Sequence, residues 1–236
     1  MKKSLMASFA AFVFALTVFP VFAGDAAVFQ EIGFSEDEKT FIFGQYGMTD
    51  MDFEPWAEIY VVDVEKNDYV AGEVYKTSKI KVHADSGKKA YQELSDKCEW
   101  KLAKYKAKPS SVENLVYVRD KESKLPTDEI VFKDYENSSA EKSEYYHFKL
   151  IPSFSGKGEN VLSSYYIDLQ KKDGEGNVIY KKIVGNPDIK RKGVSSYKIV
   201  RCFSGKSGQN LVFIIEKTFE DKSGTSIRYM VETVKL

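Results

Sequence analysis

Most of the chain after its first residues consists of short runs of β-branched and aromatic residues that are separated by turn residues. The run AEIYVVDV at residues 57–64, for example, is followed by a turn at Asn67-Asp68 and then by the alternating run Tyr69 to Tyr75. Runs of this length and composition predict antiparallel strands joined by hairpins. We therefore expect strands at residues 28–34, 40–46, 57–64, 69–75, 115–118, 130–132, 145–151, 163–169, 178–184, 197–203, 211–219 and 227–234.

One segment follows a different period. Between residues 87 and 107 the apolar side chains recur every three or four positions, at Tyr91, Leu94, Cys98, Leu102 and Tyr105. This spacing predicts an α-helix with one buried face, ended by Lys108-Pro109. The expected fold is therefore mainly β, either an antiparallel sandwich or an incomplete propeller-like array of sheets, with one amphipathic helix (about residues 87–107) packed on a sheet.

The first 23 residues have the composition of an export signal. Lys2 and Lys3 give a positive start, an uncharged apolar run follows at residues 5–19, and Val-Phe-Ala at residues 21–23 precedes Gly24. These features predict a bacterial secretory signal peptide over residues 1–23. The alternative, an N-terminal membrane anchor, needs about 20 apolar residues, and this run is shorter.

Cleavage would leave residues 24–236 as a single β-rich secreted domain with a helical insertion. We expect no membrane span after signal cleavage and an exported location, either periplasmic or secreted. The expected partner is then a protein or a glycan of the cell envelope.

The charge of the chain is balanced overall but unevenly distributed. It has 35 basic and 35 acidic residues, and this balance argues against nonspecific nucleic-acid binding. Residues 24–75 contain many acids and only Lys39 and Lys66 as bases, whereas residues 76–108 are rich in lysine. The two segments attract each other, present opposite faces, or are ordinary solvated surface.

Two cysteines, Cys98 and Cys202, remain after the signal. Export makes a disulfide between them chemically feasible. A free cysteine is equally a small buried apolar residue, and the sequence leaves both states open. Neither cysteine has a partner at the spacing of a zinc site.

The sequence contains no recognisable catalytic constellation, so we do not expect an enzyme or a cofactor. His83 and His147 are the only histidines, and no GxSxG nucleophile motif is present. Asp50, Asp52 and Glu54 alternate in one loop, which predicts either a calcium site or a solvated acidic turn.

Aromatic residues flank that acidic loop. Phe53, Trp56 and Tyr60 are candidates for an interaction surface, or else for sheet core and cross-strand pairing. The function expected first is a non-enzymatic binding or envelope-associated module. The alternative is a carboxylate-based glycan hydrolase, which needs two converging acids of which one has a raised pKa.

The two ends of the mature chain share a pattern. FSEDEKTFIFGQYG precedes AEIYVVDV near the start, and FSGKSGQNLVFIIEKTF precedes IRYMVETV at the end. Aligned on Phe34-Ser35 and Phe203-Ser204, the copies need a gap of two residues, and they look either like propeller-blade units or like two ordinary hairpins. These sequences, with Arg-Tyr-Met-Val at residues 228–231, resemble a family of bacterial predicted secreted proteins of unassigned function. The resemblance implies export and carries no site residues.

The signal peptide yields a direct prediction. Mass spectrometry of the protein recovered from its native host should find Gly24 as the first residue, because cleavage follows Ala23. A protein that still begins with Met1 would contradict this prediction.

Overall fold

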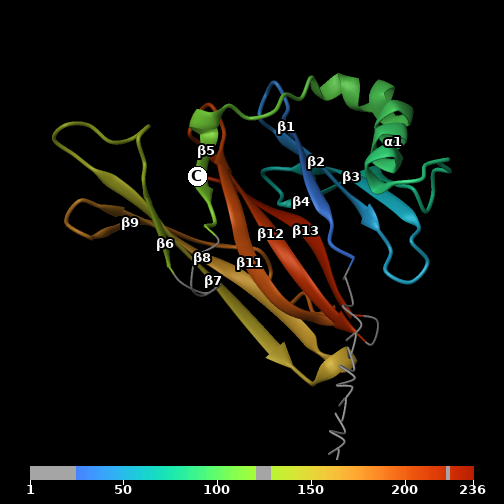
Figure 1. Ribbon diagram of the computed structural model, residues 1–236. Coiled ribbons are helices and arrows are strands. Elements are labelled where there is room, and N and C mark those ends of the chain that lie inside the picture. Colours follow the sequence, from blue (N-terminus) through green and yellow to red (C-terminus); the bar gives the residue numbers. More distant parts are fainter. Residues whose placement is uncertain (1–24, 121–128, 222–223) are drawn as a thin grey trace, which may run out of the picture.

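Three antiparallel sheets and one α-helix make up residues 25–120, 129–221 and 224–236, which are the residues that the computed structural model describes (Figure 1). The mainly β class is confirmed, whereas the predicted signal peptide lies outside the described residues. No helix in these ranges is both long and apolar enough to cross a membrane.

The elements are β1 (Val28–Phe34), β2 (Thr40–Met48), β3 (Pro55–Asp63), β4 (Asp68–Lys76), α1 (Gly87–Leu102), η1 (Ala103–Tyr105), η2 (Val112–Asn114), β5 (Leu115–Val118), β6 (Ile130–Lys133), β7 (Glu144–Ser155), η3 (Gly158–Asn160), β8 (Leu162–Asp173), β9 (Val178–Val184), β10 (Arg191–Lys192), β11 (Val194–Ser204), β12 (Asn210–Asp221) and β13 (Gly224–Lys235).

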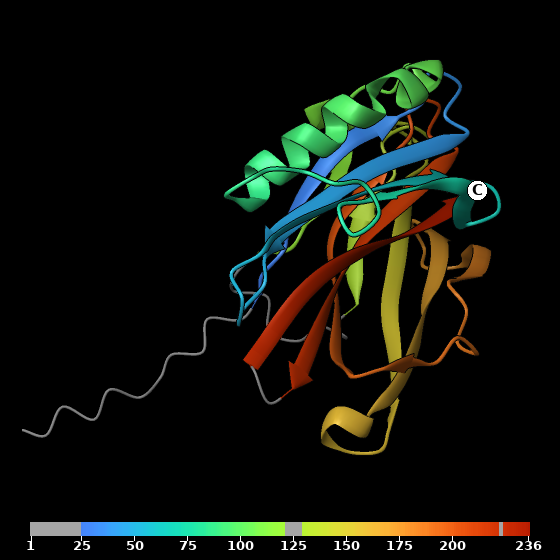
Figure 2. The same ribbon diagram turned by 90° about the vertical axis from the view of Figure 1, so that its right-hand side faces the viewer.

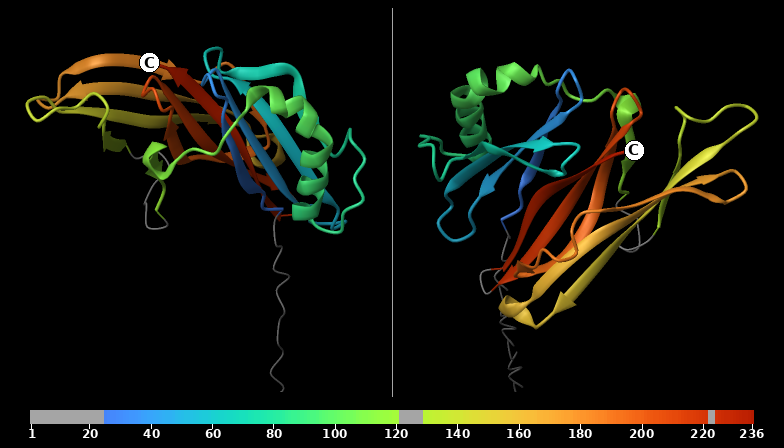
Figure 3. Two further views of the ribbon diagram at one scale, coloured as in Figure 1. Left: turned by 90° about the horizontal axis from the view of Figure 1, so that it is seen from above. Right: turned by 180° about the vertical axis from the view of Figure 1, so that it is seen from behind.

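The sheets and the helix form four layers. The helix-side sheet has the order β1-β2-β3-β4, the central sheet β13-β12-β11-β5, and the outer sheet β10-β8-β7-β6, with β9 also pairing with β8. One core lies between α1 and the helix-side sheet, a second between the helix-side and central sheets, and a third between the central and outer sheets. Figure 3 shows the red central strands between the blue helix-side strands and the yellow and orange outer strands.

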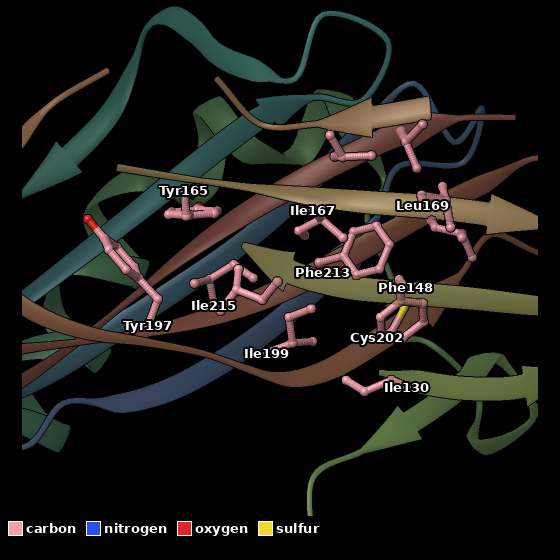
Figure 4. Close-up of a cluster of buried hydrophobic side chains, with 14 of the residues drawn as sticks. Ile130, Phe148, Tyr165, Ile167, Leu169, Tyr197, Ile199, Cys202, Phe213 and Ile215 are labelled. Atoms are coloured by element: carbon pink, nitrogen blue, oxygen red, sulfur yellow. The ribbon is translucent and has the colours of Figure 1, made fainter. Parts of the chain in front are cut away.

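Strand β12 explains why the central sheet needs a layer on each side. Leu211, Phe213 and Ile215 face the outer sheet, whereas Val212 and Ile214 face the helix-side sheet. Because successive side chains of a strand point to opposite faces, an unbroken apolar run can be satisfied only between two layers. Figure 4 shows the side chains of the third core, in which the Phe213 and Phe148 rings meet edge to face at 5.1 Å.

Helix α1 covers the remaining apolar face of the helix-side sheet, as Figure 2 shows. Ala90, Leu94 and Cys98 are fully buried in the core against this sheet. The α-helix ends at Leu102 and continues as the 3₁₀ turn η1, so the predicted helical end at residue 107 was too late. Leu102 is half-buried at the edge of this core.

Ion pairs connect the acidic first segment with the lysine-rich segment that follows it. They join Lys76 to Glu58 at 2.8 Å and Lys106 to Glu36 at 2.8 Å, and Lys104 is paired with Glu73. The charge pattern left open whether the two segments attract each other, and at these pairs they do. The Lys106 and Glu36 side chains are mostly exposed, so that pair adds little to stability.

The repeated sequence pattern corresponds to two equivalent hairpin turns. Ser35 N–H donates to the Thr40 carbonyl at 2.9 Å in the β1–β2 turn, and Gly205 N–H donates to the Asn210 carbonyl at 2.9 Å in the β11–β12 turn. The structure therefore equates Ser35 with Gly205, and the two-residue gap of the sequence alignment was wrong. Glu38 and Gly208 occupy the same place in their turns, with φ of 56° and 67°.

The two cysteines are free thiols in different cores. Cys98 lies between α1 and the helix-side sheet, whereas Cys202 faces the outer sheet. A disulfide requires Cα atoms within about 7 Å, whereas packed sheets are about 10 Å apart. The disulfide that the sequence left open is therefore not formed, and the buried apolar role applies to both.

The packing of α1 predicts the effect of truncating one side chain. Leu94→Ala should lower the free energy of unfolding by about 2–5 kcal/mol, because it leaves a cavity at a fully buried site. Glu99→Ala on the exposed side of the same helix should change it by less than about 0.5 kcal/mol. Urea denaturation followed by circular dichroism measures both, and equal losses would show that α1 packs through another face.

Candidate functional site

The acidic loop between β2 and β3 does not assemble a cation site. Thr49 N–H donates to the Glu54 carbonyl at 2.9 Å and Glu54 N–H donates to Thr49 Oγ1 at 2.8 Å, so the loop is closed by its own hydrogen bonds. Asp52 and Glu54 are exposed and Asp50 is half-buried. Within the described ranges, no three His, Cys, Asp or Glu side chains are grouped to hold a metal ion. The structure therefore does not bring Asp50, Asp52 and Glu54 together as calcium ligands.

The three aromatic residues near that loop do not form one surface. Phe53 is 73% exposed at the tip of the loop. Trp56 is half-buried beneath the Arg228 guanidinium, which lies 4.0 Å from its ring centroid. Tyr60 is buried in the core between the helix-side and central sheets. The prediction of one interaction surface made by these three residues is therefore wrong. Tyr60 has instead the core role that the sequence left open as the alternative.

The two histidines lie on different layers. His83 is exposed just before α1, and its backbone N–H donates to the Glu93 carboxylate at 2.9 Å. His147 is on β7 of the outer sheet, with Nδ1 at 3.1 Å from Glu129 Oε1. The fold therefore does not combine them in one site.

A cleft of about 510 Å³ runs along the free edge of β13, between the helix-side and outer sheets. Its floor is Met230–Val234 of β13, and one wall is the turn and the start of β4, Glu65–Tyr69. The other wall is the end of β9 and the loop that follows, Lys182–Asn186 together with Ile189 and Arg191. This volume is within the usual range of ligand-binding pockets.

Side-chain amides cap the free edge of β13 at two positions, Thr233 in the cleft and Tyr229 beside it. Tyr229 N–H donates to Gln45 Oε1 at 2.8 Å, and Thr233 N–H donates to Asn67 Oδ1 at 2.6 Å. An uncapped edge strand is a template for pairing with another chain. The two amides, one on β2 and one in the β3–β4 turn, occupy bonds that a further strand would otherwise make.

A buried carboxylate, Glu232, joins all three sheets at the floor of the cleft. Glu232 is 5% exposed and accepts hydrogen bonds from Tyr165 of β8 at 2.6 Å and from Asn67 Nδ2 at 2.5 Å. Burial, together with the Glu232 charge, raises the pKa of Tyr165 well above its ordinary value. The phenol therefore stays protonated and remains a donor, so the network is fixed at neutral pH.

Sequence reasoning missed this network, although one signal was present. Glu232 shares its side of β13 with Met230 and Val234, which face the third core. An acid at a core-facing position of a strand needs hydrogen-bond donors, since an unpaired buried charge is costly. That position marks a polar site, but its donors come from Asn67 and Tyr165, which are distant in sequence.

The network predicts the effect of removing the Asn67 side chain. Asn67→Gly should lower the free energy of unfolding by about 1–3 kcal/mol, because Thr233 N–H and the Glu232 carboxylate each lose a partner. Asn67→Ala should cost about 1 kcal/mol more, because Asn67 has a φ of 53° and a Cβ is strained there. The control Lys66→Ala, which removes a side chain that is 78% exposed, should cost less than about 1 kcal/mol in the same urea titration. Equal losses for Asn67→Gly and Lys66→Ala would show that the amide does not hold the edge.

Comparison with known proteins places these features in a family. No curated protein and no solved structure matches the chain. A family model described as predicted secreted protein (DUF2259) matches residues 42–235, a range that runs from β2 to the end of β13 and so contains the cleft, its two amide caps and Glu232. The resemblance inferred from the two ends of the chain is thus confirmed, and export is the property that the family description gives. The chain belongs to this family of predicted secreted proteins.

Proposed function

We propose that the protein is an exported, non-enzymatic binding module of the cell envelope and that its ligand occupies the cleft along β13. The observation that carries the proposal is the set of large apolar side chains at this cleft that remain open to water. Tyr69 is 40% exposed and Ile189 50%. Large apolar side chains gathered at the mouth of a cleft are typical of a binding site.

The rigidity of the cleft supports the same proposal. Asn67 belongs to one wall, Glu232 to the floor and Tyr165 to the outer sheet, and their hydrogen bonds connect the three. A cleft whose walls are already held in place loses little conformational entropy when a ligand enters. The geometry therefore favours binding to a preformed site.

The carboxyl groups favour binding over the alternative, a carboxylate-based glycan hydrolase. Such an enzyme needs a carboxylic acid whose pKa is raised so that it can donate a proton. Within the described residues, every carboxyl pKa that is displaced is displaced downward. At Glu58, burial opposes the change, but hydrogen bonds from Lys76 and Tyr60 lower the pKa.

Photo-cross-linking in the native host tests the proposal. A benzophenone amino acid placed at Ile189 should form a discrete adduct with an envelope component, because this side chain lines the cleft and is half exposed. The matched control carries the same amino acid at Val112, which is 87% exposed and does not line the cleft.

An adduct at position 189 that is absent at position 112 supports the site, and both variants should melt within a few degrees of the parent protein. No adduct at position 189, or the same adducts at both positions, would overturn the proposed function.

A further inference from the structure

We propose that the ligand of the β13 cleft is a neutral saccharide, bound with one sugar ring against Tyr69. This inference rests on the proposed function, since it names the ligand class of the same cleft. Three observations carry it: the balance of charge along the walls, the closed edge of β13, and the position of the Tyr69 ring.

The charges of the cleft cancel. Its lining has three cationic side chains, Lys66, Lys182 and Arg191, and three carboxylates, Glu65, Asp68 and Glu232. The cations also have partners of their own, since Lys66 pairs with Asp63 at 3.0 Å and Lys182 Nζ donates to the Lys235 carbonyl at 3.2 Å. With no surplus of either sign, the cleft offers no net electrostatic attraction to a charged ligand.

The closed edge of β13 argues against an extended peptide added to the central sheet as a fifth strand. Such a peptide binds through a run of unpaired backbone groups. Here the N–H groups of Tyr229 and Thr233 are already capped, and Lys182 occupies the carbonyl of Lys235. Between these caps Val231 is only 5% exposed, so little backbone is left to pair with.

Tyr69 supplies the surface that a sugar ring needs. Its ring packs on Tyr60 with the centroids 5.0 Å apart, which holds it in place, and it remains 40% exposed on the cleft wall. The C–H groups on one face of a pyranose pack against an aromatic face, while its hydroxyls need planar donors and acceptors beside the ring. Asp68 and the exposed Asn186 line the same cleft and provide a carboxylate and an amide.

Calorimetry with defined oligosaccharides tests the inference. The probes are cellotetraose, maltotetraose, xylotetraose and fully N-acetylated chitotetraose as neutral chains, with tetragalacturonate as the acidic comparison. At least one neutral probe should bind, and its affinity should change less than twofold between 50 and 500 mM salt because no charge attracts it.

Variants of Tyr69 place the binding in the cleft. Tyr69→Ala should lower the affinity for the bound probe at least tenfold. Tyr69→Phe keeps the ring, so its affinity should stay within threefold of that of the parent protein. Tyr135→Ala is the matched control, because Tyr135 is 81% exposed outside the cleft and its loss should leave the affinity unchanged. Thermal melts of all three variants show that they are folded.

The outcomes separate this inference from the proposed function. Binding of tetragalacturonate alone would overturn the inference of a neutral saccharide. Binding of a neutral probe that Tyr69→Ala leaves intact would overturn it too. If no oligosaccharide binds while a displayed library of random nine-residue peptides yields a binder that Tyr69→Ala abolishes, the saccharide is wrong and the proposed function stands. If neither set of probes binds and cross-linking at position 189 gives no adduct, both fail together.

Discussion

Burial of both faces of the central sheet is the constraint on which the rest of the structure depends. Strand β12 has large apolar side chains on each side, from Leu211 to Ile215, so water can contact neither face. One layer on each side is therefore obligatory, and the helix-side sheet, itself apolar on two faces, requires a further cover from α1. The stack can end at the outer sheet because its far face is partly polar, with Lys149 on β7 opposite Asp168 on β8.

A stack of this kind leaves the edges of its inner sheet as the weak points. The edge of β13 lies in the gap between two other sheets, where its outward backbone groups have no neighbouring strand to pair with. Gln45 and Asn67 solve the problem locally by supplying amide oxygens in place of a strand. The cleft is what remains of the gap once these caps are in position, so the groups that protect the edge also shape the candidate binding site.

Local sequence patterns were sufficient for most of the strands but not for the layers. Alternation and turn residues located β1 and β9 at their observed bounds, because strand pairing in hairpins is decided by near neighbours. The bounds of β5 were also located, although its partner β11 is distant in sequence. Periodicity could not tell which core Tyr60 would join, since both faces of β3 are buried and its run shows no polar side.

Long-range contacts account for most of the other differences. The α-helix ends early because the chain must leave it to reach β1, where Lys108 N–H donates to the Phe34 carbonyl at 3.1 Å and Glu36 N–H to the Tyr105 carbonyl at 3.1 Å. Strand β10 has only two residues, too few for any pattern. The site also depends on long-range contacts: its donors and acceptor come from three layers, and only the acid at Glu232 can be noticed in the sequence.

The positions of the two thiols have a kinetic consequence for an exported chain. Cys98 and Cys202 are both fully buried, with the helix-side sheet and the backbone of the central sheet between them. An oxidant outside the cytoplasm can join them only while the chain is still unfolded, and the resulting bridge would be incompatible with the layered structure. Folding and oxidation therefore compete for the newly translocated chain. Rapid closure of the hairpins, whose contacts are local, favours the reduced and correctly folded product.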